Sequence, residues 1–101
     1  MAMLHTVNKS PFERSSLKSC LDHAKDGSSV LLFEDGIYGA IKGSAAVDSI
    51  QGASGVTFYV LGPDVKARGI SEDRLVDGVT VIDYKGFVDL VTTHDNVQSW
   101  L

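Results

Sequence analysis

Cys20 is the only cysteine in the chain, and a single thiol can carry one sulfur atom or simply pack. It lies in a segment, Pro11–Lys25, that the sequence predicts to be a helix. On a helical wheel Cys20 falls at the border of the apolar side, and His23 lies one turn further along. A protonated His23 could lower the pKa of the thiol, whereas a buried cysteine behaves as a small hydrophobic residue. Both interpretations remain open at this point.

Other site chemistries find less support. A lone thiol forms no internal disulfide and no zinc site by itself, and Cys-x-x-Cys is absent. The histidines are too scattered for a metal site: His5 is interpreted as a buried strand residue, and His94 as a residue favoured by a helix C-terminus. No glycine pattern matches a nucleotide-binding loop. Asp35 and Asp64 precede expected helices and are interpreted as their caps. We therefore expect no cofactor and no metal.

The elements that would position these residues alternate between strands and helices. Ser10-Pro11-Phe12-Glu13 is a capping box that starts the first helix. Further helices are expected to begin at Asp35 and Gly62 and to span Tyr84–His94, with a turn or two over Ser44–Ile50. The expected strands are Leu4–Val7, Ser29–Phe33, Val56–Leu61, Val79–Asp83 and Val97–Leu101. This order predicts an α/β three-layer sandwich, with a small, mostly parallel sheet of four to five strands and helices on both faces.

Composition narrows the class of protein further. The 101 residues fit one domain, 1–101, with 13 acidic and 9 basic residues and a net charge of −4. Direct nucleic-acid binding normally requires a basic stripe, which is missing. No apolar run is long enough to span a membrane. A lone cysteine without an export signal indicates a cytoplasmic protein.

Several blocks of residues, taken together, resemble the DsrH/TusB family. They cover nearly the whole chain, with the weakest stretch at Gly43–Gly55: Leu4–Arg14, Cys20-Leu21, Leu32–Tyr38, Tyr59–Asp64, Ala67–Gly69, Asp83-Tyr84, Gly86–Leu90 and Val97–Leu101.

The resemblance implies a small α/β subunit of a cytoplasmic heterohexameric sulfur-relay complex. Its partners would be two related subunits, DsrE/DsrF-like or TusD/TusC-like, and a DsrC/TusE-like sulfur carrier. In this family the main sulfur-carrying cysteine is ascribed to the DsrE/TusD subunit. Having Cys20 resembles the DsrH branch, so oxidation of intracellular sulfur is the first expectation. The alternative is a TusB-like role in 2-thiolation of wobble uridine in tRNA.

Three hypotheses follow, and they leave open whether the chain itself is an enzyme. In the first, Cys20 transiently carries a persulfide with His23 as its thiolate partner. In the second, the thiol is inert and the chain is a structural and docking subunit whose interface includes Tyr84, Trp100 and Leu101. In the third, the chain is a stand-alone small-molecule binder, although it lacks a phosphate motif.

Overall fold

One five-stranded parallel sheet organises the chain. The computed structural model describes residues 3–10, 16–24, 26–42, 50 and 55–100. The strands lie in the order β4-β3-β2-β1-β5, and every neighbouring pair is parallel. They span Met3–Val7 (β1), Ser29–Leu32 (β2), Thr57–Leu61 (β3), Val79–Ile82 (β4) and Asn96–Trp100 (β5). The predicted strands are thus confirmed to within two residues at their ends.

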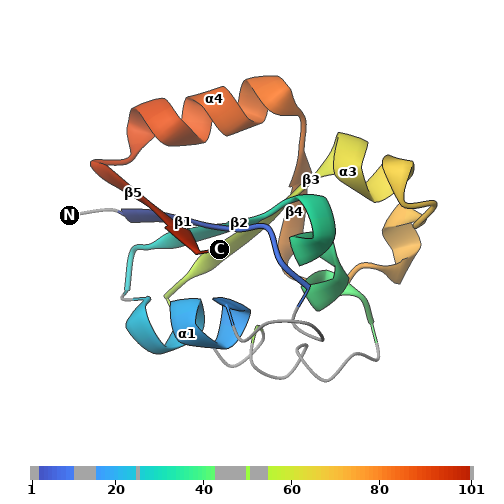
Figure 1. Cartoon of the computed structure of the whole chain (residues 1–101). Helices are drawn as coiled ribbons and strands as arrows, with labels where there is room; N and C mark the ends of the chain where they lie inside the picture. Colours follow the sequence, from blue (N-terminus) through green and yellow to red (C-terminus); the bar gives the residue numbers. More distant parts are fainter. Residues whose placement is uncertain (1–2, 11–15, 25, 43–49, 51–54, 101) are drawn as a thin grey trace.

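Helices cover both faces of this sheet, as predicted. In Figure 1, α4 lies along one face of the sheet and α1 along the other. The helices η1 and α3 lie together near the carboxyl ends of the strands. The described helices are α1 (Ser16–His23), α3 (Gly62–Ala67), α4 (Tyr84–Thr93) and two short 3₁₀ helices, η1 (Glu34–Ala40) and η2 (Glu72–Arg74). The first predicted helix is confirmed over Ser16–His23, and Ala24, which was predicted to be helical, lies outside it. Pro11 and Glu13 of its capping box, and 44–49 of the turn predicted over Ser44–Ile50, lie outside the described residues.

The face of the sheet under α1, here the α1 face, carries the larger core. Alternate strand side chains point to it because successive residues of a strand face opposite ways. Its buried members come from β1, β2, β3, α1 and the segments around η1, and they include Val7, Leu17, Cys20, Val30, Leu32, Ile37, Phe58, Val60 and Val65. All of these are at most 4% exposed.

The opposite side, here the α4 face, is covered more thinly. Its buried cluster consists of Leu4, Leu31 and Leu90, with Tyr59, Ile82 and Phe87 only partly buried against it. The two faces of one sheet are therefore closed to different degrees, which matters for the site described next.

His94 fixes the end of α4 to the beginning of β2. Its Nδ1 lies 2.7 Å from the carbonyl oxygen of Leu90, and its Nε2 lies 2.9 Å from Oγ of Ser29. An Nδ1–H that donates to the carbonyl leaves Nε2 free to accept from the serine hydroxyl. Two specific hydrogen bonds thus hold His94 where the sequence suggested only a favourable helix dipole.

Candidate functional site

Cys20 is sealed inside the core of the α1 face. Its side chain is 0% exposed and belongs to the main cluster of buried residues. Burial disfavours the charged thiolate and raises the pKa of Cys20 from 9.0 to about 12. At neutral pH the thiol is therefore protonated and shielded, whereas sulfur transfer needs an accessible thiolate. The geometry supports the inert alternative and argues against a persulfide carrier at Cys20.

His23 has a different environment from the thiol it was expected to activate. Its side chain is exposed, and its ring centroid lies 5.4 Å from that of Trp100, with the rings tilted by 38°. Cys20, one turn earlier, points into the core. The imidazole therefore packs on the indole at the surface of the domain, so the predicted pairing of thiol and imidazole gains no support.

Trp100 makes its contacts within its own domain. Its half-buried side chain packs against the core of the α1 face, and its Nε1–H donates to Nδ1 of His5 at 3.0 Å. It is therefore a poor candidate for the exposed interface anchor suggested by the sequence. Leu101, its predicted companion, lies outside the described residues.

At the carboxyl edge of the sheet, Asp64 holds the beginning of η1. Its carboxylate accepts a hydrogen bond at 2.6 Å from the backbone N–H of Glu34. Glu34 is the first residue of η1 and lies two residues after the end of β2. Glu34 adopts a φ of 48°, in the left-handed region that non-glycine residues rarely occupy. The prediction that Asp64 caps its own helix is wrong: α3 is preceded by Leu61 and has no side-chain cap bond.

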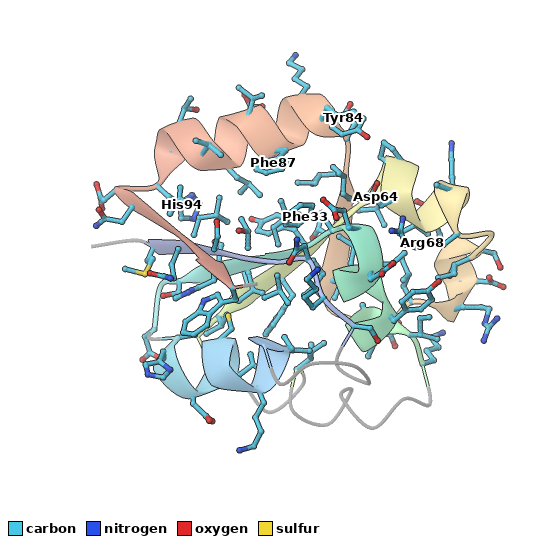
Figure 2. The ribbon with its side chains drawn as sticks, viewed as in Figure 1. Phe33, Asp64, Arg68, Tyr84, Phe87 and His94 are labelled. Carbon is cyan, nitrogen blue, oxygen red and sulfur yellow. The ribbon has the colours of Figure 1, made fainter. Side chains whose placement is uncertain are left out.

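Asp35 and Arg68 join the same two elements by an ion pair. Nε and Nη2 of Arg68 both donate to Oδ1 of Asp35, at 3.1 and 2.9 Å. Asp35 lies inside η1 instead of capping it, because η1 begins at Glu34 after Phe33 with no side-chain cap bond. Figure 2 shows Asp64 in α3 and Arg68 directly after this helix, both on the side toward η1. These contacts fix the two helices together and bring no nucleophile to the edge.

A cavity of about 470 Å³ lies beside this cluster, at the carboxyl ends of β3 and β4. Its size suits a small ligand. Its lining mixes apolar side chains with one lysine and two carboxylates: Gly62, Pro63, Lys66, Glu72, Val81, Ile82 and Asp83. The Asp83 carboxylate already accepts the Gly86 N–H at 2.8 Å as the N-cap of α4. Nothing in the lining offers a paired acid and base or a nucleophile with its activator.

An apolar stripe lies on the outer side of α4. Tyr84, Val88 and Val91 follow one another at helical spacing and are 61%, 61% and 42% exposed. We call these three residues the α4 stripe. The exposure of Tyr84 suits the interface role predicted for it, which stays a prediction. Helical spacing puts Val91 on the same side of the helix as Phe87 and Leu90, yet Val91 is exposed. The spacing of residues 84, 88 and 91 was the available signal for the stripe.

The described residues offer neither a metal-binding cluster nor a membrane-spanning helix. They contain no group of three His, Cys, Asp or Glu side chains arranged to hold a metal ion. None of the helices described is long and apolar enough to cross a membrane.

Comparison with known proteins adds a family and relatives. A family model described as "DsrH like protein" matches residues 9–97. Protein TusB of Pectobacterium parmentieri is 36% identical over 98 residues, covering 97% of this chain and all of that protein. Protein TusB of Klebsiella pneumoniae (strain 342) is 35% identical over 100 residues, with the same coverage.

Solved structures agree on the fold. The ychN protein from E. coli superposes with a TM-score of 0.84 at 17% identity, covering 98% of both chains. MTH1491 from Methanobacterium thermoautotrophicum gives 0.74 at 15% identity, covering 96% of this chain and 97% of that one. At such low identity these likenesses show the fold alone.

Proposed function

The chain belongs to the DsrH-like family, and we propose on that basis that it is a subunit of a sulfur-relay complex for tRNA thiolation. In this proposal the complex passes sulfur toward 2-thiolation of wobble uridine. The chain completes the complex and docks its partners, which are TusD/TusC-like subunits and a TusE-like carrier. Sulfur itself travels on a cysteine of a partner subunit.

The choice of pathway departs from the first expectation. Oxidation of intracellular sulfur was favoured because the chain has Cys20, but a buried thiol gives that argument little weight. Likeness to TusB proteins along the full length supports the alternative, thiolation of tRNA. The net charge of −4 fits a subunit of a complex that hands sulfur to proteins, and a subunit that does not itself touch the tRNA.

The single observation that supports a docking role best is the contrast between the sealed thiol and the exposed α4 stripe. The only sulfhydryl is 0% exposed, while Tyr84 and Val88 are each 61% exposed. Contiguous exposed apolar side chains mark protein interaction surfaces. The chain thus exposes apolar side chains that a partner could contact and buries its thiol, as expected of a structural subunit.

A complementation experiment tests this function. The gene is deleted in the native host and restored as wild type or as Cys20→Ala, and 2-thiouridine in bulk tRNA is measured by mass spectrometry. We expect deletion to abolish the thiolated nucleoside and both forms to restore it. Unchanged thiouridine in the deletion strain, with loss of sulfur oxidation, would instead favour the DsrH-like role.

Persulfide mapping separates docking from sulfur carriage. The assembled complex is loaded by a cysteine desulfurase, and the mass of one added sulfur atom is located by peptide mapping. We expect the added sulfur on a cysteine of a partner subunit. Complexes that contain Cys20→Ala should take up as much sulfur as wild-type complexes. An adduct on Cys20 that is required for transfer to the carrier would overturn the docking role.

A further inference from the structure

Trp100 is held between two histidines from different elements. His5 lies on β1 and accepts the indole N–H at 3.0 Å, with the ring centroids 6.2 Å apart. His23, at the end of α1, packs on the same indole at 5.4 Å. Trp100 itself is the last residue of β5, the strand that adds to the outer side of β1. The cluster therefore joins the edge strand to the body of the domain.

The hydrogen bond fixes the protonation state of His5. Indole Nε1 is a donor only, so Nδ1 of His5 must offer a lone pair. A neutral imidazole with one acceptor nitrogen can do this, whereas an imidazolium carries a hydrogen on both nitrogens. Protonation of His5 therefore places two N–H groups against each other and breaks the bond to Trp100.

The surroundings of His5 do not compensate such a charge. Its side chain is 2% exposed, and its register neighbours on β2 and β5, Val30 and Gln98, are uncharged. From α1 the titratable group that acts on it is His23, whose positive form repels a second positive ring. The thiol of Cys20, which lies on α1 in the core of the same face, is neutral at the same pH.

Besides its backbone pairing with β1, the strand held by this cluster has few side-chain anchors. Asn96, Val97, Gln98 and Ser99 are exposed, and the one other side-chain bond from β5 to β1 among the described contacts joins Thr6 Oγ1 to Ser99 Oγ at 3.2 Å. Trp100 is the single residue of β5 that packs against the core. Removing its hydrogen bond therefore weakens the attachment of the strand as a whole.

We propose that His5 and Trp100 form an acid-sensitive latch: neutral His5 holds β5 in the sheet, and protonated His5 releases it. Release would uncover the indole and the outer edge of β1, whose backbone groups could then pair with another strand. The inference rests on this cluster alone and does not depend on the role in sulfur relay.

The pH at which the latch opens follows from linkage. Burial first, and His23 second, lower the pKa of His5 in the folded protein below its ordinary value of 6.5. The released form regains the ordinary pKa and so binds the proton more readily. Falling pH therefore favours release from about 6.5 down to the lowered folded value. Across that window the open fraction rises by up to about tenfold per pH unit.

The test uses the indole N–H, which is unique because the chain has one tryptophan. The full chain labelled with ¹⁵N is titrated by NMR from about pH 7.5 to about pH 5. We expect the indole N–H to lose its downfield, hydrogen-bonded shift in step with the titration of His5. Amide exchange over 97–100, corrected for intrinsic pH dependence, should accelerate in the same window, while β2 stays protected.

Two variants make the outcome decisive. In His5→Gln the amide oxygen can accept the indole bond without titrating, so the transition should disappear. In His23→Gln one cause of the lowered folded pKa of His5 is removed, so the pH window should narrow and the open fraction should rise less, while the transition remains. The latch is refuted if the wild-type indole and the amides of 97–100 are unchanged below pH 6.5. It is equally refuted if His5→Gln shows the wild-type transition.

Discussion

The two faces of the sheet differ in how completely they are covered. On the α1 face, side chains from the strands, α1 and the segments around η1 form a large cluster of buried residues. On the α4 face, the buried cluster holds only Leu4 and Leu31 from the strands and Leu90 from α4, and aromatic side chains such as Phe87 remain partly exposed. Figure 2 shows Phe33 and Phe87 between the sheet and α4, and their ring centroids are 6.0 Å apart.

This difference assigns separate roles to the two faces. The α1 face buries enough apolar surface to stabilise the domain, and Cys20 belongs to that packing. The α4 face ends in the exposed α4 stripe, an arrangement typical of a surface completed by a partner. Sulfur carriage by this chain would instead require an accessible thiol.

Matched valine truncations should show the largest contrast between the faces. Val60→Ala, at a side chain that is 0% exposed, should lower the free energy of unfolding by about 2 kcal/mol through lost burial and a cavity. Val88→Ala, at a side chain that is 61% exposed, should change it by less than about 0.5 kcal/mol. Urea denaturation of the full chain measures both. Equal losses would contradict the contrast.

The buried thiol should make stability fall at alkaline pH. The pKa of Cys20 is raised from 9.0 to about 12 in the fold, so the unfolded chain loses the proton first. The free energy of unfolding should therefore decrease as pH rises from 9 toward 12.

Alkylation at about pH 8 gives a second readout of the same thiol. The native thiolate fraction should be roughly a thousandfold below that of the unfolded chain. Cys20→Ala is the control for stability, since its alkaline loss should be smaller. Rapid alkylation of native Cys20 would show that the thiol is open.

Loss of the N-cap of α4 should have an intermediate effect. Asp83→Ala removes the acceptor for the Gly86 N–H at 2.8 Å and should cost about 1 kcal/mol. Asp83→Asn keeps a capping oxygen and should stay near wild type. Thermal unfolding compares the three proteins. An unaltered melting temperature in Asp83→Ala would mean that this cap contributes nothing to the α4 face.

The ion pair between η1 and α3 should contribute least. Arg68 is 23% exposed and Asp35 49% exposed, so water screens their attraction. Arg68→Ala should lower the free energy of unfolding by less than about 1 kcal/mol, measured by chemical denaturation. Lys66→Ala on the same helix is the control, with no loss expected. A much larger loss of stability in Arg68→Ala would show that this ion pair contributes more to folding than its exposure to solvent suggests.

The sequence predicted the sheet better than the site. Buried apolar runs such as Ser29–Phe33, between turn signals, are typical of parallel strands, and β2 forms over Ser29–Leu32. Asp35 and Asp64 were misassigned because each side chain binds a group far along the chain, which local capping rules cannot reveal.

The solvent exposure of individual side chains was hardest to predict, because it depends on how other elements of the fold pack against them. A helical wheel places Cys20 at a border, yet in the fold it belongs to the buried cluster of the α1 face, against which Trp100 of β5 also packs. Val91 shows the opposite case: its helical position suggested cover, and the sheet beneath α4 does not reach it. Both depend on tertiary packing that no single segment encodes.

The most direct test of the docking role is co-purification of the complex with a lysine placed on or off the α4 stripe. Val88→Lys puts a charge on the stripe, where docking would bury it at high cost. Asp89→Lys adds the same side chain at the next, exposed position of the helix. We expect that Val88→Lys no longer retains the TusD/TusC-like subunits, whereas Asp89→Lys and wild type retain them equally. Equal retention of these partners by both variants would contradict the docking role of the α4 stripe.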